Sequence, residues 1–262
     1  MRKTPFALLT LVLTLLPAIP LAAARRAKPL EPAALLKKAV DTMGGAEAVD
    51  AVKSLELHGS SKRVLPNGQE WSLNTVSYYA FPDRYRQEAT LPIGGTLVTL
   101  VSPQGAFLQT GQTGGVQLPD EQRVEITRSI ARNPLMVLQR RAQLKPTIEA
   151  NEKIDGKDAV ILKFDEEIGS TKVALDTKSG EILQIIYSTA GGIDAKQAEM
   201  TVSYSDYRPA GNVRFPYAST GTVGGKPAFS FKAEKVVVNG ALDDKLFAPG
   251  PVEAPEAKPK PW

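Results

Sequence analysis

The residue types that most often do chemistry in proteins are scarce in this sequence of 262 residues. It contains no cysteine and a single histidine, His58. Without cysteine there are no disulfides, thiolate nucleophiles, cysteine-ligated zinc sites or iron–sulfur clusters, and no lipid anchor on an N-terminal cysteine. A site with several histidine ligands cannot be built, and a Ser-His-Asp triad would have to use His58. The composition therefore excludes most common catalytic designs.

The remaining polar candidates do not form a catalytic pattern. His58 alternates with the apolar Leu57, which predicts that it lies on the polar face of a strand. Residues 165–167 (Asp-Glu-Glu) are carboxylates that paired-acid catalysis or a calcium site would use, but they run into a glycine-containing turn and are interpreted as a solvated strand end. No nucleophile-elbow, Walker or Rossmann glycine motif is present. We therefore expect a protein that is not an enzyme and has no metal or cofactor.

The charge balance gives no argument for binding nucleic acid. Lys and Arg number 32 against 28 Asp and Glu, a net charge of +4, and no basic block is interleaved with aromatic residues. With 42% hydrophobic and 23% charged residues, the composition is that of an ordinary globular protein. A chain of this length can bury roughly three quarters of its unfolded surface.

The first 24 residues predict an export signal. Arg2 and Lys3 supply a positive start, residues 6–16 are an apolar run, and small residues allow cleavage near Ala24. The alternative is a transmembrane anchor, but the run is shorter than the ~20 residues that cross a bilayer. We expect signal-peptide cleavage and export.

Helical spacing of apolar residues predicts a helix at 33–43, stopped by two glycines, and a short helix at 46–52. A central helical pair is predicted at 120–131 and from Asn133 to Leu144, with Asp120 and Asn133 as N-caps. Residues 242–247 are predicted as a final turn, capped by its aspartates.

Alternation with a period of two predicts about twelve short strands. Five form a meander between residues 54 and 110, followed by a glycine-rich loop at 111–119. Seven more are predicted at 147–154, 159–166, 171–176, 181–188, 198–207, 213–222 and 228–239. Because strands and helices do not alternate, and because so many strands cannot stay flat, we predict a mainly β (α+β) fold. It is a strongly curved antiparallel sheet, or half-open β-barrel of about 11–12 strands, with helices covering the concave face.

These elements divide the chain into four parts. We predict a signal peptide at 1–24, a linker at 25–32, a single domain at 33–248, and a disordered Pro-rich tail at 249–262.

Several local strings, taken in this order, resemble the LolA/LolB-like family of periplasmic lipoprotein-localisation factors. They are FPDRYR at 81–86, SPQG at 102–105, NPLM at 133–136, YSDY at 204–207, VRFP at 213–216 and LDDKLF at 242–247. The resemblance implies a half-open barrel plugged by helices, an apolar cavity for acyl chains, and a periplasmic location. The receptor branch of the family is anchored through an N-terminal cysteine, which is absent here, so the soluble carrier branch is the nearer match. Arg63, Arg84 and Arg86 are equal candidates for the family's functional arginine.

Inward apolar positions on successive strands would line such a cavity, although a packed core is the alternative for each of them. The strand candidates are Leu57, Leu73, Tyr85, Leu97, Val160, Leu162, Phe164, Met200, Val202, Phe229 and Phe231, and the helix candidates are Leu135, Met136 and Leu138. The helix from Asn133 to Leu144 would act as a lid, with the loop at 111–115 as its hinge.

We therefore expect a periplasmic, monomeric carrier that binds acyl chains of lipoproteins or lipids and transfers them toward the outer membrane. Membrane-bound donor and acceptor proteins would be further partners. The alternative is a periplasmic sensor or scaffold of the same fold that binds a protein partner in envelope stress. A continuous apolar void would support the carrier, a filled interior would support the scaffold, and a hollow lined by charge would contradict both the cavity and the carrier.

Overall fold

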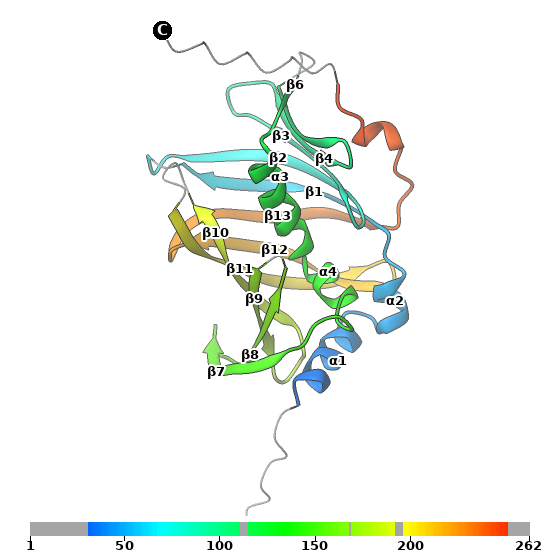
Figure 1. Ribbon diagram of the computed structural model, residues 1–262, viewed down its shortest axis with the longest axis vertical. Coiled ribbons are helices and arrows are strands. Elements are labelled where there is room, and N and C mark those ends of the chain that lie inside the picture. Colours follow the sequence, from blue (N-terminus) through cyan, green and yellow to red (C-terminus); the bar gives the residue numbers. More distant parts are fainter. Residues whose placement is uncertain (1–30, 66, 111–114, 168, 192–195, 251–262) are drawn as a thin grey trace, which may run out of the picture. The chain divides into compact units, whose positions relative to one another are not determined.

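The computed structural model describes residues 31–65, 67–110, 115–167, 169–191 and 196–250 (Figure 1). The predicted signal peptide, nearly all of the linker and tail, and most of the predicted hinge at 111–115 lie outside these residues. Those predictions stay predictions.

One antiparallel sheet of thirteen strands forms within the described residues. The strands are β1 (Ser54–Val64), β2 (Glu70–Ala80), β3 (Arg84–Thr90), β4 (Thr96–Ser102), β5 (Gly105–Thr110), β6 (Gly115–Gln117), β7 (Thr147–Ile154), β8 (Lys157–Glu166), β9 (Gly169–Asp176), β10 (Ile182–Gly191), β11 (Lys196–Ala210), β12 (Val213–Val223) and β13 (Lys226–Val238). All the predicted strands are confirmed, while the prediction of a loop over 111–119 misses β6, whose three residues are too few for a period-two pattern to show.

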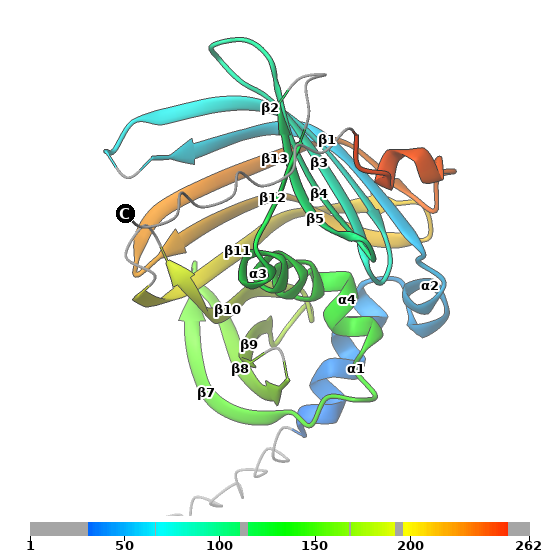
Figure 2. The same ribbon diagram turned by 45° about the horizontal axis from the view of Figure 1, so that its top comes forward.

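The strand order is β6-β5-β4-β3-β2-β1-β13-β12-β11-β10-β9-β8-β7. Two meanders, β1–β6 and β7–β13, therefore join where β1 pairs with β13, for example with Leu57 opposite Val236. We call this pairing the seam. The sheet curves around the helices without closing, because β6 and β7 are its two edges (Figure 2). The predicted half-open architecture is confirmed.

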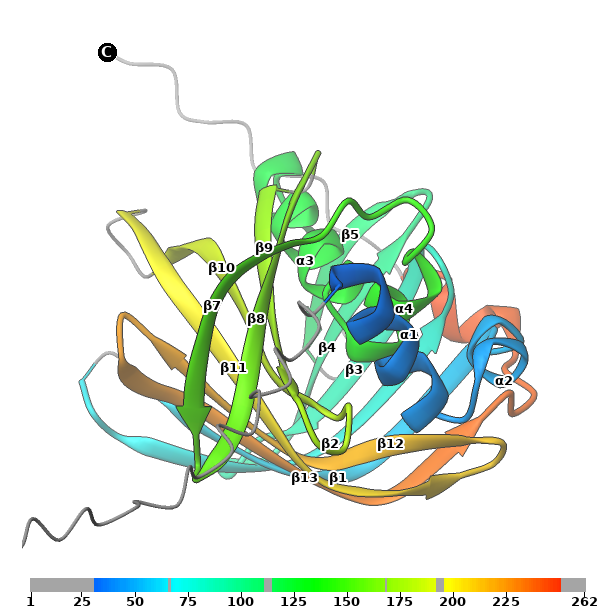
Figure 3. The same cartoon turned by 90° about the horizontal axis from the view of Figure 1, so that it is seen from below.

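The helices are α1 (Pro32–Thr42), α2 (Ala46–Asp50), α3 (Asp120–Ala131), α4 (Pro134–Gln139) and the short 3-10 helix η1 (Asp244–Phe247). Figure 3 shows α1, α3 and α4 on the inner side of the curved sheet, as predicted. No helix of the described residues is long and apolar enough to span a bilayer.

Two details of the central helical pair differ from the prediction. Pro119, not Asp120, is the N-cap of α3, and Asp120 takes the first helical position. Asn133 caps α4 as predicted, because its side chain accepts a hydrogen bond from the Leu135 amide at 3.0 Å. However, α4 ends at Gln139 and does not reach Leu144. Its last carbonyls are satisfied by the Arg140 and Arg141 side chains, so a further helical turn is not needed.

The main core lies between α1, α4 and the inner face of the sheet. Leu135 and Leu138 of α4 are fully buried there, together with Val160, Leu162 and Phe164 of β8. A smaller cluster on the outer face is made by η1, whose Phe247 packs against residues of β4 and β5.

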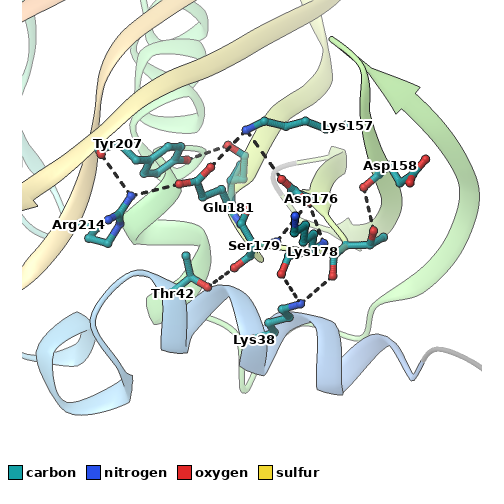
Figure 4. A network of polar contacts seen from close by, with 12 residues as sticks. Lys38, Thr42, Lys157, Asp158, Asp176, Lys178, Ser179, Glu181, Tyr207 and Arg214 are labelled. Carbon is teal, nitrogen blue, oxygen red and sulfur yellow. Dashed lines mark hydrogen bonds and ion pairs between the residues drawn. The ribbon is translucent and has the colours of Figure 1, made fainter.

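A network of polar contacts fixes α1 on the turn between β9 and β10 (Figure 4). Lys38 Nζ donates hydrogen bonds to the carbonyls of Thr177 at 2.7 Å and of the next residue at 2.8 Å. Thr42 Oγ1 donates to the carbonyl of Ser179 at 2.6 Å. Gly180 follows with a φ of +82°, and a Cβ there would lie 2.8 Å from Thr42 Oγ1. This turn therefore needs glycine both for its backbone and for the close approach of α1.

The Asp176 side chain also stabilises the turn between β9 and β10 by hydrogen bonds inside it. Its carboxylate accepts hydrogen bonds from the amides of Lys178 at 2.8 Å and Ser179 at 3.2 Å. Burial acts to raise the pKa of Asp176, but these hydrogen bonds and Lys157 outweigh it, so its pKa lies below the ordinary 3.8. The charged form of Asp176 therefore stabilises the turn on which α1 rests.

Candidate functional site

A cavity of about 380 Å³ lies between the concave face of the sheet and the junction of α3 and α4. Its wall comes from both meanders, with β1, β2 and β3 on one side of the seam and β10 to β13 on the other. Alternate residues of each strand point inward, as Thr75, Ser77 and Tyr79 of β2 do. Ser129, Arg132, Asn133 and Pro134 of the helical junction complete the wall.

Part of the predicted set of cavity residues lies in this wall, and the rest lies elsewhere. The wall contains Leu57, Tyr85, Met200, Val202, Phe229 and Phe231. The main core holds Leu135, Leu138, Val160, Leu162 and Phe164. Leu73 and Met136 are buried, and Leu97 is half-buried, outside the wall. The inward residues of β8 leave no hollow because α1 and α4 pack into the same core.

Aromatic side chains form much of the apolar wall. The rings of Tyr79 and Tyr85 lie 4.8 Å apart, and Phe229 packs over Gly221 of the neighbouring strand. A Cβ on Gly221 would come within 2.0 Å of the Phe229 ring, so only glycine leaves the ring in this place. Burial raises the pKa of Tyr79, Tyr85 and Tyr204, so their hydroxyls stay protonated and act as neutral hydrogen-bonding groups at physiological pH.

Polar side chains on β1, β2 and β3 form a row in the wall that the prediction did not include. We call Ser61, Thr75, Ser77 and Gln87 the polar row. Ser61 Oγ and Thr75 Oγ1 share a hydrogen bond of 2.9 Å, and Gln87 Nε2 donates to Ser77 Oγ at 3.2 Å. Their positions could have been found from the sequence, because they keep the inward parity of Leu57 and Tyr79.

Two arginines also line the cavity. Arg63 is exposed, and its guanidinium lies over the Phe229 ring at 5.2 Å. Arg132 is only 3% exposed and stacks on Tyr187 at 4.1 Å. Burial lowers the pKa of Arg132, but a guanidinium keeps its charge in proteins. Arg63 and Arg132 are the charged residues of the wall and its other residues are neutral, so the hollow is not lined by charge, although it is only in part apolar.

The residues first considered for chemistry lie away from this cavity. His58 is on the opposite face of β1, where its ring contacts the carboxylate of Glu56. Asp165 is exposed, as a solvated strand end requires, but Glu166 is not, since it forms an ion pair of 2.5 Å with Arg140. In the part of the chain that the structure describes, no three His, Asp or Glu side chains gather as a metal site.

The two central helices differ sharply in how they are packed. Every residue of α4 from Pro134 to Leu138 is buried, whereas Ile130 alone is buried in α3. Residues 134–138 of the predicted lid at Asn133 to Leu144 are thus part of the core. The helix with the looser packing is α3, and it adjoins the cavity through Ser129.

The curved antiparallel sheet with helices and a cavity on its concave side is the architecture that the sequence resemblance to the LolA/LolB-like family implied. A DUF1329 family protein from Desulfovibrio piger has a TM-score of 0.52 to this chain at 13% identity, over 84% of this chain and 98% of that one. Two further solved structures are similar. A putative outer membrane lipoprotein-sorting protein domain from Vibrio parahaemolyticus has a TM-score of 0.48 at 9% identity, over 81% of this chain and 95% of that one. A LolA superfamily protein from Nitrosomonas europaea has a TM-score of 0.47 at 13% identity, over 84% of this chain and 98% of that one.

No protein-family model and no curated protein sequence matches the chain. At identities this low, the likeness to the Desulfovibrio piger structure shows the fold alone.

Proposed function

We propose that this protein is a non-enzymatic periplasmic carrier that holds the acyl chain of a lipid or lipoprotein in the cavity and transfers it toward the outer membrane. The observation that carries the proposal is the hollow of about 380 Å³ between the concave face of the sheet and the junction of α3 and α4. Met200, Val202, Phe229 and Phe231 offer it an apolar wall. The volume is at the lower end of the roughly 300–1,000 Å³ typical of ligand pockets, which favours one hydrocarbon chain over several.

A cavity of this size is compatible with reversible binding of one hydrocarbon chain. Each buried methylene contributes about 0.8 kcal/mol, so a chain that enters only in part is held firmly but can still leave. A carrier must release its ligand, and a single partly covered chain allows that release.

Native mass spectrometry of the protein isolated from its host envelope tests the proposal directly. We expect a bound lipid or acylated molecule, and a mature chain that begins at Arg25 if the signal peptide is removed. A ligand-free protein that also takes up no fluorescent fatty acid would refute the carrier. A single fixed membrane protein found by cross-linking in the absence of lipid would instead support the sensor alternative.

A substitution that fills the cavity gives a second test. Val202→Trp places a large side chain in the wall, whereas Val116→Trp makes the same change at a position that is 55% exposed. We expect uptake of the fluorescent fatty acid to fall at least about tenfold for the first variant and to stay unchanged for the second. Ser219→Leu, at a partly exposed position of the wall, repeats the test if Val202→Trp fails to fold. Equal uptake by all variants would place the ligand elsewhere.

A further inference from the structure

The charged residues that line the cavity are both arginines. Two guanidinium groups, those of Arg63 and Arg132, belong to its wall, and no Asp or Glu does among the described residues. Glu125 and Glu166 interact electrostatically with Arg132 and offset part of its charge, so the positive potential that favours an anionic occupant is concentrated at Arg63.

Arg63 differs from most arginines of the structure in its surroundings. The usual arrangement in this protein is an ion pair with a carboxylate, which is found for Arg84, Arg86, Arg128, Arg140, Arg141, Arg208 and Arg214. Arg63 has no such ion pair within the described residues, and it lies over the Phe229 ring, which cannot neutralise its charge. An exposed cation at a cavity wall, held by stacking alone, is free to bind an anion with its donors.

Neutral donors lie beside Arg63 on the same face. Ser61 is two residues along β1, and it begins the polar row that continues through Thr75 and Ser77 to Gln87. Hydroxyl and amide groups of this kind complete the hydrogen bonding of a bound anion next to a guanidinium. Tyr204 also lines the cavity, and its hydroxyl, which burial keeps protonated by raising its pKa, adds another donor to the wall.

We infer that the ligand is an anionic single-chain amphiphile whose charged headgroup binds Arg63 and the polar row. Its hydrocarbon chain lies against Phe229 and Phe231, which pair with Arg63 and Ser61 across the seam, and against Val202 farther along the same wall. This inference rests on the proposed function and adds the chemical class of the ligand to it. A carboxylate and a phosphate monoester share the required chemistry, and the probes below distinguish them.

The experiment compares three probes with the same chain, namely hexadecanoate, hexadecyl phosphate and the neutral hexadecanol, by displacement of a bound fluorescent fatty acid. Arg63→Gln removes the charge at an exposed position, Arg63→Lys keeps it, and Lys62→Gln removes a neighbouring charge on the outer face of β1. We expect Arg63→Gln to weaken the better-bound anionic probe by about 10- to 100-fold and hexadecanol by less than about twofold. Arg63→Lys should recover most of the affinity, and Lys62→Gln should leave all probes unchanged.

The outcomes separate this inference from the proposed function. If hexadecanol binds as tightly as both anions, and Arg63→Gln weakens none of them, the carrier stands and the anionic class is wrong. If none of the probes binds the wild-type protein, the proposed function fails as well. A larger effect of Arg63→Gln on hexadecyl phosphate than on hexadecanoate would assign a phosphate headgroup, and the reverse would assign a carboxylate.

Discussion

Replacing Leu138 by alanine tests whether α4 is a fixed part of the core. Leu138 is fully buried in the cluster that joins α1, α4 and the sheet. Leu→Ala at such a position costs about 2–5 kcal/mol, because a cavity remains where the side chain was. For a domain of this size, about 1 kcal/mol shifts Tm by ~2–4 °C, so a loss of about 3 kcal/mol predicts a Tm lower by ~6–12 °C.

The matched control is Val124→Ala in α3. Val124 is 44% exposed, and its truncation should change stability by no more than about 0.5 kcal/mol. Urea and thermal unfolding followed by circular dichroism measure both variants. A loss below about 1 kcal/mol for Leu138→Ala would show that α4 is not packed as described.

Amide hydrogen exchange measures whether α3 or α4 opens locally. Amides of α4 should exchange only on global unfolding, whereas those of α3 should exchange through local opening and should slow when a fatty acid binds. Equal exchange of the two helices, or protection by ligand in α4 alone, would refute the reasoning that α3 is the mobile element beside the cavity.

Three further predictions concern single residues. A Cβ on Gly59 would lie 2.1 Å from the backbone oxygen of Lys232 across the seam. Gly59→Ala should therefore lower the free energy of unfolding by about 1–3 kcal/mol. An unchanged urea midpoint of this variant would contradict the prediction. Gly221→Ala should displace the Phe229 ring and weaken fatty-acid binding by roughly tenfold in a fluorescence titration, and unchanged affinity would show that the ring is not part of the site. Because the pKa of Asp176 is depressed on folding, its stabilisation is present above the ordinary value of 3.8 and is lost as pH falls through the folded pKa. Asp176→Asn should therefore be less stable at neutral pH and show a smaller loss of stability in acid, and urea midpoints that fall in parallel with the wild type would contradict this.

Much of the sheet could be predicted from the sequence because strands such as β1 and β2 bury one face. In β2, for example, the alternation that places Thr75, Ser77 and Tyr79 on one side is visible in the chain itself, and the turns between strands are marked by glycine and proline. The strand β6 was missed because Gly115–Gln117 is too short to show any period.

The depth of each inward residue could not be predicted in the same way. Alternation predicts the face on which Phe164 and Phe231 lie, but not whether a helix packs against them. Phe164 meets the buried helices, whereas Phe231 borders the hollow. The difference depends on where α1 and α4 dock, which is determined by contacts between residues far apart in the chain, such as that of Lys38 with Thr177.

The seam has a consequence for how the nascent chain matures. The β1 strand leaves the ribosome well before β13, because the paired residues Leu55 and Val238 are separated by about 180 positions. Until β13 arrives, this edge of β1 has no neighbour and can pair with another chain during folding. Lys62 and Arg63, which carry positive charge at the far end of β1, oppose such aggregation. The arginine inferred to recognise the ligand would thus also protect the unfinished polypeptide.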